Sequence, residues 1–354
     1  MLKGKFEFTA DFLTSLMKPK SPPLIGVDIS SSSVKMVELG GSGKGHYRLE
    51  RYTIEPLVKD AVVDGNIMNL EQVGDAVRRG WKRMGTRIKN LAMALPSAAV
   101  ITKKIVVPAG QTEDELESQV EAEANQYIPF ALEEVNLDFQ TLGPAPNNPE
   151  EAEVLIAASR KEKVEDRVAV AESVGLKAVV MDIDAFASQN AFELMSSQLP
   201  EGGNDQTIAL VDIGASMMNI NVLRNFQSVY MREQPFGGNQ LTQEIMRQYS
   251  LSAEEADAAK RNGGLPGTFE SDVLAPFMDT LALEVVRALQ FFYTSTQFNQ
   301  VHHIFLSGGT ASIPGLPQVV AERTQVNTLV ANPFGGMEIA SKIKQQQLVV
   351  DAPA

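Results

Sequence analysis

Short apolar runs bounded by turn residues predict a β-rich start to the folded chain. After Pro22-Pro23, three such runs are expected to form strands: residues 24–29, 34–39 and 47–54. A glycine-rich turn at 40–43 separates the second from the third. A helix is expected behind the N-cap Asn69, because apolar residues recur every four positions from Val73 to Trp81. The apolar run 91–95, which ends at Pro96, predicts a buried strand.

The next segment, residues 98–180, has its own alternation of strands and helices. Strands are expected at four places: 100–107, 135–142, 153–158 and 177–183. A Pro- and Asn-rich turn, 144–149, separates two of them. Capping boxes at Thr112/Glu115 and Ser159/Glu162 predict the starts of two helices. The order β-α-β-β-α-β indicates a small α+β subdomain.

The second half of the chain repeats the opening pattern. After a polar linker, 200–206, come a strand, a tight hairpin, another strand and Phe236-Gly237-Gly238 ahead of a helix. A capping box at Ser252/Glu255 opens a further helix, and a long helix is expected from about Asp279. The chain therefore predicts two hairpin-and-helix units, each with an insertion, in a duplicated α/β architecture.

Composition narrows the classes of function. The chain has 354 residues, 44% of them hydrophobic, which is enough for two or three domains with real cores. Its net charge of −13 argues against a nucleic-acid partner, which needs clustered Lys and Arg. With no cysteine and three histidines, a disulfide framework and a zinc site are not expected, and a reducing cytoplasm fits.

The chain carries no apolar run of the length that a membrane span needs, since the longest, 91–101, is broken by Pro96 and Ser97. Residues 1–22 mix phenylalanines with lysines, such as Phe6, Phe8, Lys18 and Lys20. This extension is expected to be partly ordered, and the alternative is that it docks on an anionic membrane surface or on a partner.

Two hairpins carry the candidate chemistry. Each has an apolar strand ending in Asp, followed by small residues: Asp28 with residues 30–33, and Asp212 with residues 214–216. Small turn residues let backbone N–H groups approach phosphate oxygens, and serine hydroxyls add donors. Lys35 would supply a cation for the β- or γ-phosphate. Both carboxylates would hold Mg²⁺ largely through water, because direct contact with phosphates is repulsive.

Two downstream elements complete the candidate site. Gly308-Gly309 would let the backbone pass close to a ribose and adenine, and Asp257 and Lys260 would reach the other side of the base. Each piece alone is more often a surface hairpin, a turn or a solvated helix face. Their order along the chain favours a nucleotide, and neither a P-loop nor a Gly-x-Gly-x-x-Gly motif is present.

These segments resemble the actin, Hsp70 and sugar-kinase superfamily: 28–35 its first phosphate motif, 212–217 its second and 307–315 its adenosine motif. Within it, the chain resembles the PilM family of type IV pilus assembly over nearly all residues after 22. The similarity is carried by five segments: 25–35, Tyr127-Ile128-Pro129-Phe130, 182–187, 236–242 and Asn332-Pro333-Phe334.

The resemblance implies an actin-like (ribonuclease H-like) two-lobed α/β fold with subdomains 1A, 1C, 2A and 2B. After the extension 1–22, the implied limits are 1A at 23–97 and 178–203, 1C at 98–177, 2A at 204–239 and 300–336, 2B at 240–299, and a return to 1A at 337–354. Family members continue with a hydrophobic helix, so this last part is expected to be truncated.

The resemblance also implies ATP with Mg²⁺ between the lobes and at most weak ATPase activity, with no catalytic residue singled out. The implied nucleotide-binding residues are Asp28, Ser30, Ser31, Ser32, Ser33, Lys35, Asp212, Gly214, Ala215, Ser216, Gly237, Gly238, Asp257, Lys260, Gly308, Gly309 and Thr310. Asp28 and Asp212 are the implied metal residues. Two positions depart from the family pattern: Ser30 replaces a glycine and Asp257 a glutamate.

The implied partner is the cytoplasmic N-terminal tail of the inner-membrane protein PilN, held in a 1A/1C groove. We expect the lining of that groove from the helix at 113–128 and nearby strands. Other implied partners are further pilus components, including assembly ATPases, and self-association is an open alternative. The expected location is cytoplasmic, peripheral at the inner membrane, in a role that supports twitching motility.

Two other functions fit the same fold. An FtsA-like filament-forming division protein would carry a C-terminal amphipathic membrane helix, and none is visible in the sequence. A small-molecule kinase would need an Asp general base and a polar sugar pocket, whereas the insertions offer apolar surfaces. Asp182, Asp184 and Gln189 are weak catalytic candidates, and we expect them to be strand-end and helix-cap residues instead.

Overall fold

The computed structural model describes residues 23–41, 46–145 and 148–354. The expectations for the extension 1–22 and for part of the turn at 40–43 lie outside these residues. The chain divides into two units: Met1–Gly40 with Arg51–Asp184, and Gly41–Glu50 with Ala185–Ala354. Each unit is described by itself. The division into four subdomains stays a prediction.

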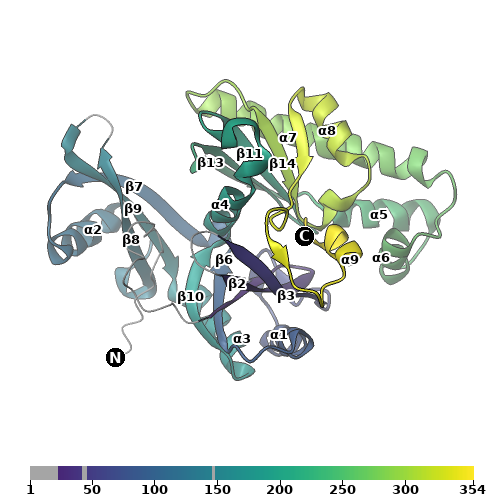
Figure 1. Ribbon diagram of the computed structural model, residues 1–354, viewed down its shortest axis with the longest axis horizontal. Helices are drawn as coiled ribbons and strands as arrows, with labels where there is room; N and C mark the ends of the chain where they lie inside the picture. The colour runs from purple at the N-terminus through teal and green to yellow at the C-terminus, as the bar shows by residue number, and fades with distance from the viewer. Residues whose placement is uncertain (1–22, 42–45, 146–147) are drawn as a thin grey trace. The chain divides into compact units, whose positions relative to one another are not determined.

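The first unit contains a mixed sheet in which β1 lies at the centre, between its hairpin partner β2 and the parallel strand β6. Figure 1 labels β2, β3, β6 and β10 of this sheet. The strand order is β10-β6-β1-β2-β3. Its strands are β1 (Ile25–Ile29), β2 (Ser33–Gly41), β3 (Tyr47–Pro56), β6 (Asn90–Leu95) and β10 (Lys177–Ile183). The predicted strands are therefore confirmed, with small shifts at their ends. A separate short hairpin pairs β4 (Val62–Val63) with β5 (Asn66–Ile67).

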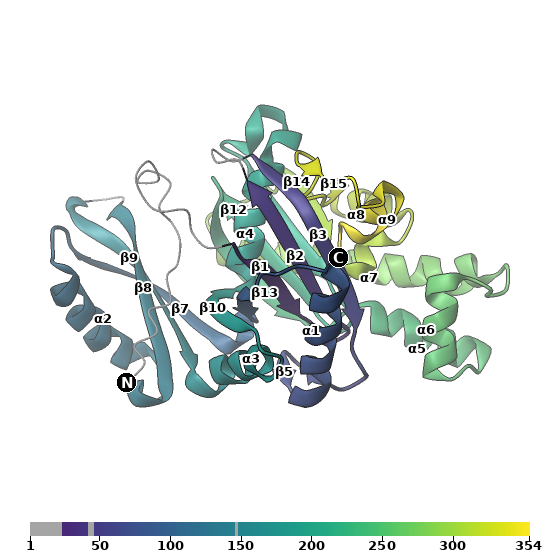
Figure 2. The ribbon, with the colours of Figure 1, turned by 60° about the horizontal axis from the view of Figure 1, so that its bottom comes forward.

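Two helices of the first unit pack side by side over this sheet: α1 (Leu70–Met84) and α3 (Lys161–Ser173) (Figure 2). The predicted N-cap of α1 is confirmed, since the Asn69 side chain accepts from the N–H of Gln72.

Arg167 of α3 is 2% exposed, and its guanidinium donates to the carbonyls of Ala94 and Gly65 at 2.9 and 3.0 Å. Backbone acceptors thus satisfy a charge that burial would otherwise penalise.

A three-stranded antiparallel sheet with the order β7-β9-β8 forms the remainder of the first unit. Its strands are β7 (Val100–Pro108), β8 (Val135–Ala145) and β9 (Asn148–Arg160), and α2 (Glu113–Tyr127) covers one face. The capping box at Thr112/Glu115 is confirmed. The fourth strand of the predicted subdomain, β10, pairs instead with β6 of the larger sheet.

Two local predictions in this region are wrong. Ser159 does not cap a helix, because it lies in β9 and its hydroxyl donates to the Ala99 carbonyl at 2.8 Å; α3 begins two residues later without a side-chain cap. The predicted turn at 144–149 is shorter, because the strands run to Ala145 and restart at Asn148. Residues 146–147 lie outside the described residues. Cross-strand pairing extended the ladder through residues that locally favour turns.

The second unit repeats the strand order of the first. Its sheet has the order β15-β14-β11-β12-β13, with β11 between an antiparallel hairpin partner and a parallel strand, as β1 is in the first unit. The strands are β11 (Thr207–Ile213), β12 (Met218–Arg224), β13 (Gln227–Gln234), β14 (His303–Ser307) and β15 (Asn327–Val330). The predicted internal duplication is thus present in the topology.

Side chains of β11 alternate between two cores. Ala209, Val211 and Ile213 pack with α5 (Gly238–Tyr249), α7 (Ala275–Ser295) and α8 (Leu316–Thr324), whereas Ile208 and Leu210 pack with α4 (Asp184–Met195). Both faces of this strand are covered, which explains its continuous apolar sequence.

The long helix α7 begins at Ala275, earlier than expected, after a π-helical turn at Glu270–Leu274. Pro276 suits its first turn, where its missing N–H removes no helical bond.

The remaining elements of the second unit are short. The predicted capping box at Ser252/Glu255 opens α6 (Ala253–Asn262), which ends at Gly263. The linker 200–206 includes a 3-10 turn at Pro200–Gly203. β16 (Glu338–Ile339) pairs with the start of β3, and α9 (Gln345–Asp351) follows it. In the described parts of the chain, helices fall short of the length and apolarity that crossing a bilayer requires.

Candidate functional site

The two Asp-bearing hairpins have the same local geometry. Asp28 and Asp212 are each the penultimate residue of the central strand of a sheet. The turn that follows is closed by one backbone bond in each case: Ser30 N–H to Ser33 O at 3.0 Å, and Gly214 N–H to Met217 O at 2.9 Å. Ser30 therefore occupies the position that Gly214 holds in the other unit.

In the first unit, Lys35 lies directly across the hairpin from Asp28. Its Nζ is 2.9 Å from Asp28 Oδ2, and the two side chains are 24% and 53% exposed. Ser30 Oγ donates to the Ser33 carbonyl at 3.0 Å, which tightens the turn. The predicted cation is therefore held at the predicted carboxylate, in a partly solvated pair that contributes little to stability.

In the second unit, three segments far apart in sequence meet at the Asp212 hairpin. Gly238 and Asn239, at the start of α5, donate their N–H groups to the carbonyls of Gly214 and Ala215 at 3.0 and 2.8 Å. Thr310 Oγ1 donates to the Gly214 carbonyl at 3.0 Å. The predicted second phosphate motif and adenosine motif of this unit are thus brought together, with the N-terminus of α5 beside them.

Glycine is required at two of these contacts. A Cβ on Gly237 would lie 2.5 Å from the Gly214 carbonyl oxygen, and one on Gly308 would lie 2.8 Å from Asp212 Oδ1. Gly308 also has φ of 85° and ψ of 161°, a conformation that is essentially restricted to glycine. Gly309, by contrast, has open space at its Cβ position. Protein atoms thus occupy the Cβ positions of Gly237 and Gly308, and this tight packing of the Asp212 turn against the start of α5 and the 308–310 loop is called the glycine cradle below.

Lys260 reaches the same region from α6. Its Nζ is 2.7 Å from Thr242 Oγ1 and 3.4 Å from the Gly238 carbonyl. Asp257, predicted for the side of the base, forms ion pairs with Lys260 at 3.2 Å and with Arg261. Thr242 was missed by the sequence analysis, because only the packing of α5 against α6 places it here.

One donor of the predicted adenosine loop is already used. The N–H of Gly308 donates to the carbonyl of Pro353 at 2.6 Å, just beyond α9 (Figure 1). Ser307 Oγ, on the preceding residue, donates to Asp212 Oδ1 at 3.2 Å. The Thr310 hydroxyl of this loop is engaged as well, because it donates to the Gly214 carbonyl.

The described residues hold no group of three His, Asp or Glu side chains that could bind a metal directly. A magnesium ion with this chain would take most of its ligands from water and phosphate, as its preference for retaining water allows. The glycine cradle beside Asp212 is compatible with such an ion carried by a nucleotide.

The three weak catalytic candidates have structural contacts. Asp184 Oδ1 accepts from the N–H and the hydroxyl of Ser97, and Gln189 Oε1 accepts from the N–H of Ser228 at 3.1 Å. Asp182 lies at the end of β10 and accepts from the N–H of Ile183 at 2.7 Å. Asp182 thus lies at a strand end and Asp184 at the start of α4, whereas Gln189 lies within α4 and contacts β13, which is neither a strand-end nor a cap role.

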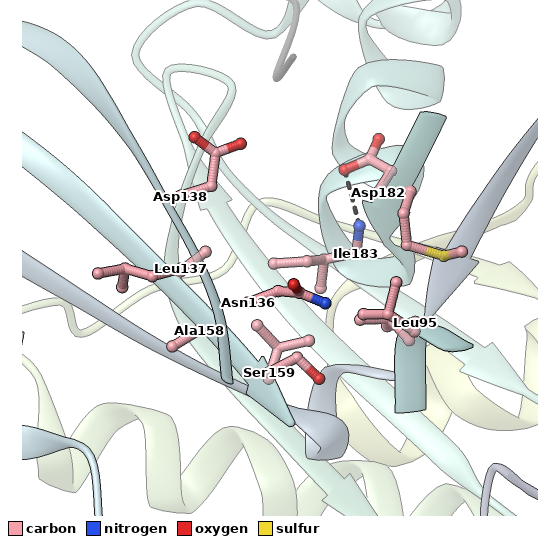
Figure 3. A pocket seen from close by; sticks show the side chains of 12 residues that line it. Leu95, Asn136, Leu137, Asp138, Ala158, Ser159, Asp182 and Ile183 are labelled. Carbon is pink, nitrogen blue, oxygen red and sulfur yellow. Dashed lines mark hydrogen bonds between the residues drawn. The ribbon is translucent and has the colours of Figure 1, made fainter. Parts of the chain in front are cut away.

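A pocket lies in the first unit between its two sheets, and Figure 3 shows it. It is small, with a cavity volume of about 40 Å³, and it is partly open to solvent. Strands β6 to β10 and helix α3 supply its walls: Leu95, Val100, Asn136, Leu137, Asp138, Ala157, Ala158, Ser159, Val164, Met181, Asp182 and Ile183. The sequence analysis expected a groove lined by the helix at 113–128 and nearby strands; this pocket is lined by strands and α3, and the groove stays a prediction.

Two carboxylates lie on opposite sides of this pocket, Asp138 on β8 and Asp182 on β10 (Figure 3). Burial raises the pKa of both groups, and one backbone N–H donated to each carboxylate partly opposes the increase. Asp138 Oδ2 is shielded from solvent and has no hydrogen-bond partner among the described residues. Asp138 was missed by the sequence analysis, although a charged residue between Leu137 and Phe139 is an available signal.

Two β-sheets of matching strand order, each opened by a hairpin with Asp at its turn, define an actin-like fold. The sequence matches the family described as type IV pilus assembly protein PilM over residues 26–354. The chain belongs to this family.

Solved structures agree with this assignment. A structure described as the PilM-PilN type IV pilus biogenesis complex is 27% identical, with a TM-score of 0.78 over 94% of this chain and 95% of that one. The ethanolamine utilization protein EutJ of Carboxydothermus hydrogenoformans is 17% identical, with a TM-score of 0.55 over 89% and 85% of the two chains. EutJ shares the fold alone.

We predict that Gly308→Ala lowers the free energy of unfolding by about 1–3 kcal/mol, because alanine is strained at this backbone conformation and its Cβ clashes with the Asp212 hairpin. The matched control is Gly309→Ala, which has open space and should change stability by no more than about 0.5 kcal/mol. Urea denaturation measures both. Equal stabilities for the two variants would contradict the tight cradle.

We predict that Asp138→Asn stabilises the protein more at pH 7 than at pH 4. Burial raises the pKa of Asp138 in the folded state, so its favourable contribution is present below the unfolded pKa and is lost as pH rises through the folded pKa. The amide removes this dependence. Denaturation at the two pH values tests it, with exposed Glu134→Gln as the control. A smaller gain at pH 7 than at pH 4 would show that the buried charge is not destabilising.

Proposed function

We propose that this protein is a scaffold of the type IV pilus assembly machinery and binds the cytoplasmic N-terminal tail of a PilN protein. The observation that carries the proposal is the match to the PilM-PilN complex, at 27% identity over 94% of the chain. Family membership over residues 26–354 supports the same role. Acting through such a partner, the protein would work at the cytoplasmic face of the inner membrane.

The pocket of the first unit could accept one side chain of a bound peptide, since its cavity volume is about 40 Å³. Its walls combine apolar side chains from both sheets, among them Leu95, Leu137 and Ile183, with a few polar groups at one side. Peptide-binding grooves use this division: apolar pockets supply affinity, and placed polar groups supply orientation. We therefore propose that the tail binds at this pocket, whose lining comes from strands and α3.

We also propose that the protein binds ATP with Mg²⁺ through its two hairpins. Each unit supplies its own support for this proposal. In the first unit it is the ion pair between Asp28 and Lys35, and in the second it is the glycine cradle together with Lys260. The proposed consequence is a preference for one conformational state, and hence for one set of partner surfaces, rather than rapid turnover.

We predict that Val100→Arg weakens binding of a synthetic PilN N-terminal peptide at least tenfold, because a charged side chain would enter an apolar wall. Val106→Arg is the matched control, since Val106 lies on the same strand but is 53% exposed and outside the pocket. Fluorescence anisotropy measures both affinities, and thermal unfolding checks the folds.

Leu137→Ala gives a second, milder change in the same pocket should Val100→Arg fold poorly. Binding that is unaltered in both pocket variants would place the tail elsewhere on the protein. Absence of binding by the wild-type chain would contradict the proposed partner.

We predict that Lys35→Ala weakens binding of a fluorescent ATP analogue in the presence of Mg²⁺ by about tenfold, since a charge-assisted contact to phosphate is lost. Its stability should change little, because the Asp28–Lys35 pair is partly solvated. Lys59→Ala, an exposed lysine, is the control. An unchanged affinity in Lys35→Ala would remove this hairpin from the nucleotide site.

A further inference from the structure

Helix α1 and the loop after it carry a dense group of cations in a chain that is otherwise strongly acidic. Six lysines and arginines fall between residues 78 and 89, and no aspartate or glutamate lies among them. The whole chain has 31 basic and 44 acidic residues, so its other segments together are more acidic than the net charge of −13 indicates. All six are exposed residues: Arg78, Arg79, Lys82, Arg83, Arg87 and Lys89.

The fold gathers these cations on one side of the first unit. Helix α1 buries an apolar side against the sheet and leaves its four basic residues on the outward side. The helix ends before Gly85, and the chain then leads through Arg87 and Lys89 into β6. The N–H of Lys177, at the start of β10, donates to the Lys89 carbonyl at 2.9 Å and brings a seventh exposed cation to the same edge. These seven residues are called the basic face below.

One buried carboxylate anchors two arginines of the basic face without using all their donors. Glu55 has a side chain that is 1% exposed, and it forms ion pairs with Arg79 at 3.5 Å and Arg83 at 2.9 Å. The two arginine side chains nevertheless stay 53% and 63% exposed. Because a guanidinium has five N–H groups, each arginine keeps donors for an external anion. Arg78 is paired with Asp75 in addition.

Local contacts do not account for the rest of the charge. Within the described residues, four members of the basic face form no ion pair: Lys82, Arg87, Lys89 and Lys177. The helix dipole favours cations in the last turn of α1, which explains Lys82 and Arg83. It does not explain the cations that lie beyond the helix. Like charges repel one another, so stability alone would favour a mixture of signs at this surface.

The chemistry of the basic face favours a flat anionic surface over a macromolecule with its own binding geometry. Protein interfaces are anchored by apolar or aromatic side chains and are depleted in lysine, and no large apolar side chain between residues 78 and 89 is exposed. Trp81 is half-buried and donates its indole N–H to the Ile88 carbonyl at 2.7 Å, so it offers no platform for a nucleic-acid base. Lipid headgroups are mobile and adapt to the spacing of the cations.

We propose that the basic face binds the headgroups of anionic phospholipids and places this side of the first unit on a membrane surface. Clusters of four to eight Lys and Arg on an amphipathic helix bind anionic lipids, and each cation near the surface contributes about fivefold in affinity. This contact goes beyond the proposed function, because it requires no partner protein. Together with a bound PilN tail it forms a two-point attachment, for which a weak lipid affinity is sufficient.

The test measures cosedimentation of the full chain with two kinds of vesicle, at low and at physiological salt. One kind is phosphatidylcholine alone, and the other is an equimolar mixture of phosphatidylcholine and phosphatidylglycerol. The test variant combines three unpaired positions: Lys82→Gln, Arg87→Gln and Lys89→Gln. The matched control removes the same net charge from exposed residues elsewhere: Lys104→Gln, Lys342→Gln and Lys344→Gln. A third variant lacks residues 1–22, and thermal unfolding checks that all variants fold.

The wild type is expected to bind the mixed vesicles and not those of phosphatidylcholine alone, with an affinity that falls as salt screens the exposed charges. The test variant should bind at least about thirtyfold more weakly, because it lacks three cations worth about fivefold each. The control variant should lose no more than about threefold, since its charges lie outside the basic face and are screened beyond about 8 Å.

Equal losses in the test and control variants would attribute binding to net charge and overturn the inference. So would equal binding to both kinds of vesicle, or no binding to either. Binding that survives in the test variant but is lost without residues 1–22 would assign the lipid contact to the N-terminal extension instead. Tighter binding to a labelled DNA duplex than to the mixed vesicles would make a nucleic acid the ligand and also overturn it.

The proposed function is tested separately. The titration with the PilN peptide is made without lipid, and the test variant should bind that peptide as the wild type does. Loss of vesicle binding with intact peptide binding therefore supports the basic face, and failure of peptide binding in the wild type contradicts the proposed partner alone.

Discussion

A close backbone approach at the Asp212 hairpin holds the candidate nucleotide-binding segments of the second unit together. The turn after β11 closes with one hydrogen bond, from Gly214 to Met217, and its free carbonyls accept donors from α5 and from Thr310. That arrangement is possible only because Gly237 and Gly308 have no Cβ. The turn, the helix N-terminus and the downstream loop form one network, so a change at any of them affects the others.

The first unit carries the same hairpin with different chemistry. Its turn is closed from Ser30 to Ser33, and the Asp28 carboxylate is paired with Lys35 across the strand. The matching order of strands around β1 and β11 explains why both aspartates end a central strand. Duplication therefore fixed the positions of the two carboxylates, whereas their partners differ: a lysine in one unit, a serine hydroxyl in the other.

The pocket beside β10 shows a second use of the same scaffold. The three-stranded sheet is inserted after β6, and the chain returns through α3 to add β10 next to that strand. This path leaves β8 and β9 facing the end of β10, with apolar side chains and two aspartates between them. The insertion thus creates a pocket in which Asp138 Oδ2 is buried without a hydrogen-bond partner among the described residues.

The sequence by itself determined most of the strands, the capped helices at Asn69, Thr112 and Ser252, and the duplicated hairpins, because these depend on short-range periodicity and on local side-chain bonds. Prediction from the sequence was wrong where tertiary contacts compete with the local preference of a segment for a helix or a turn. Ser159 resembles a helix cap but lies in a strand, since the β7–β9 ladder continues through it. Only the folded chain decided that Thr242 would meet Lys260, that Pro353 would accept from Gly308, and that Asp138 would face Asp182 across a pocket. Those contacts join residues that sequence spacing does not relate, so their positions follow from packing.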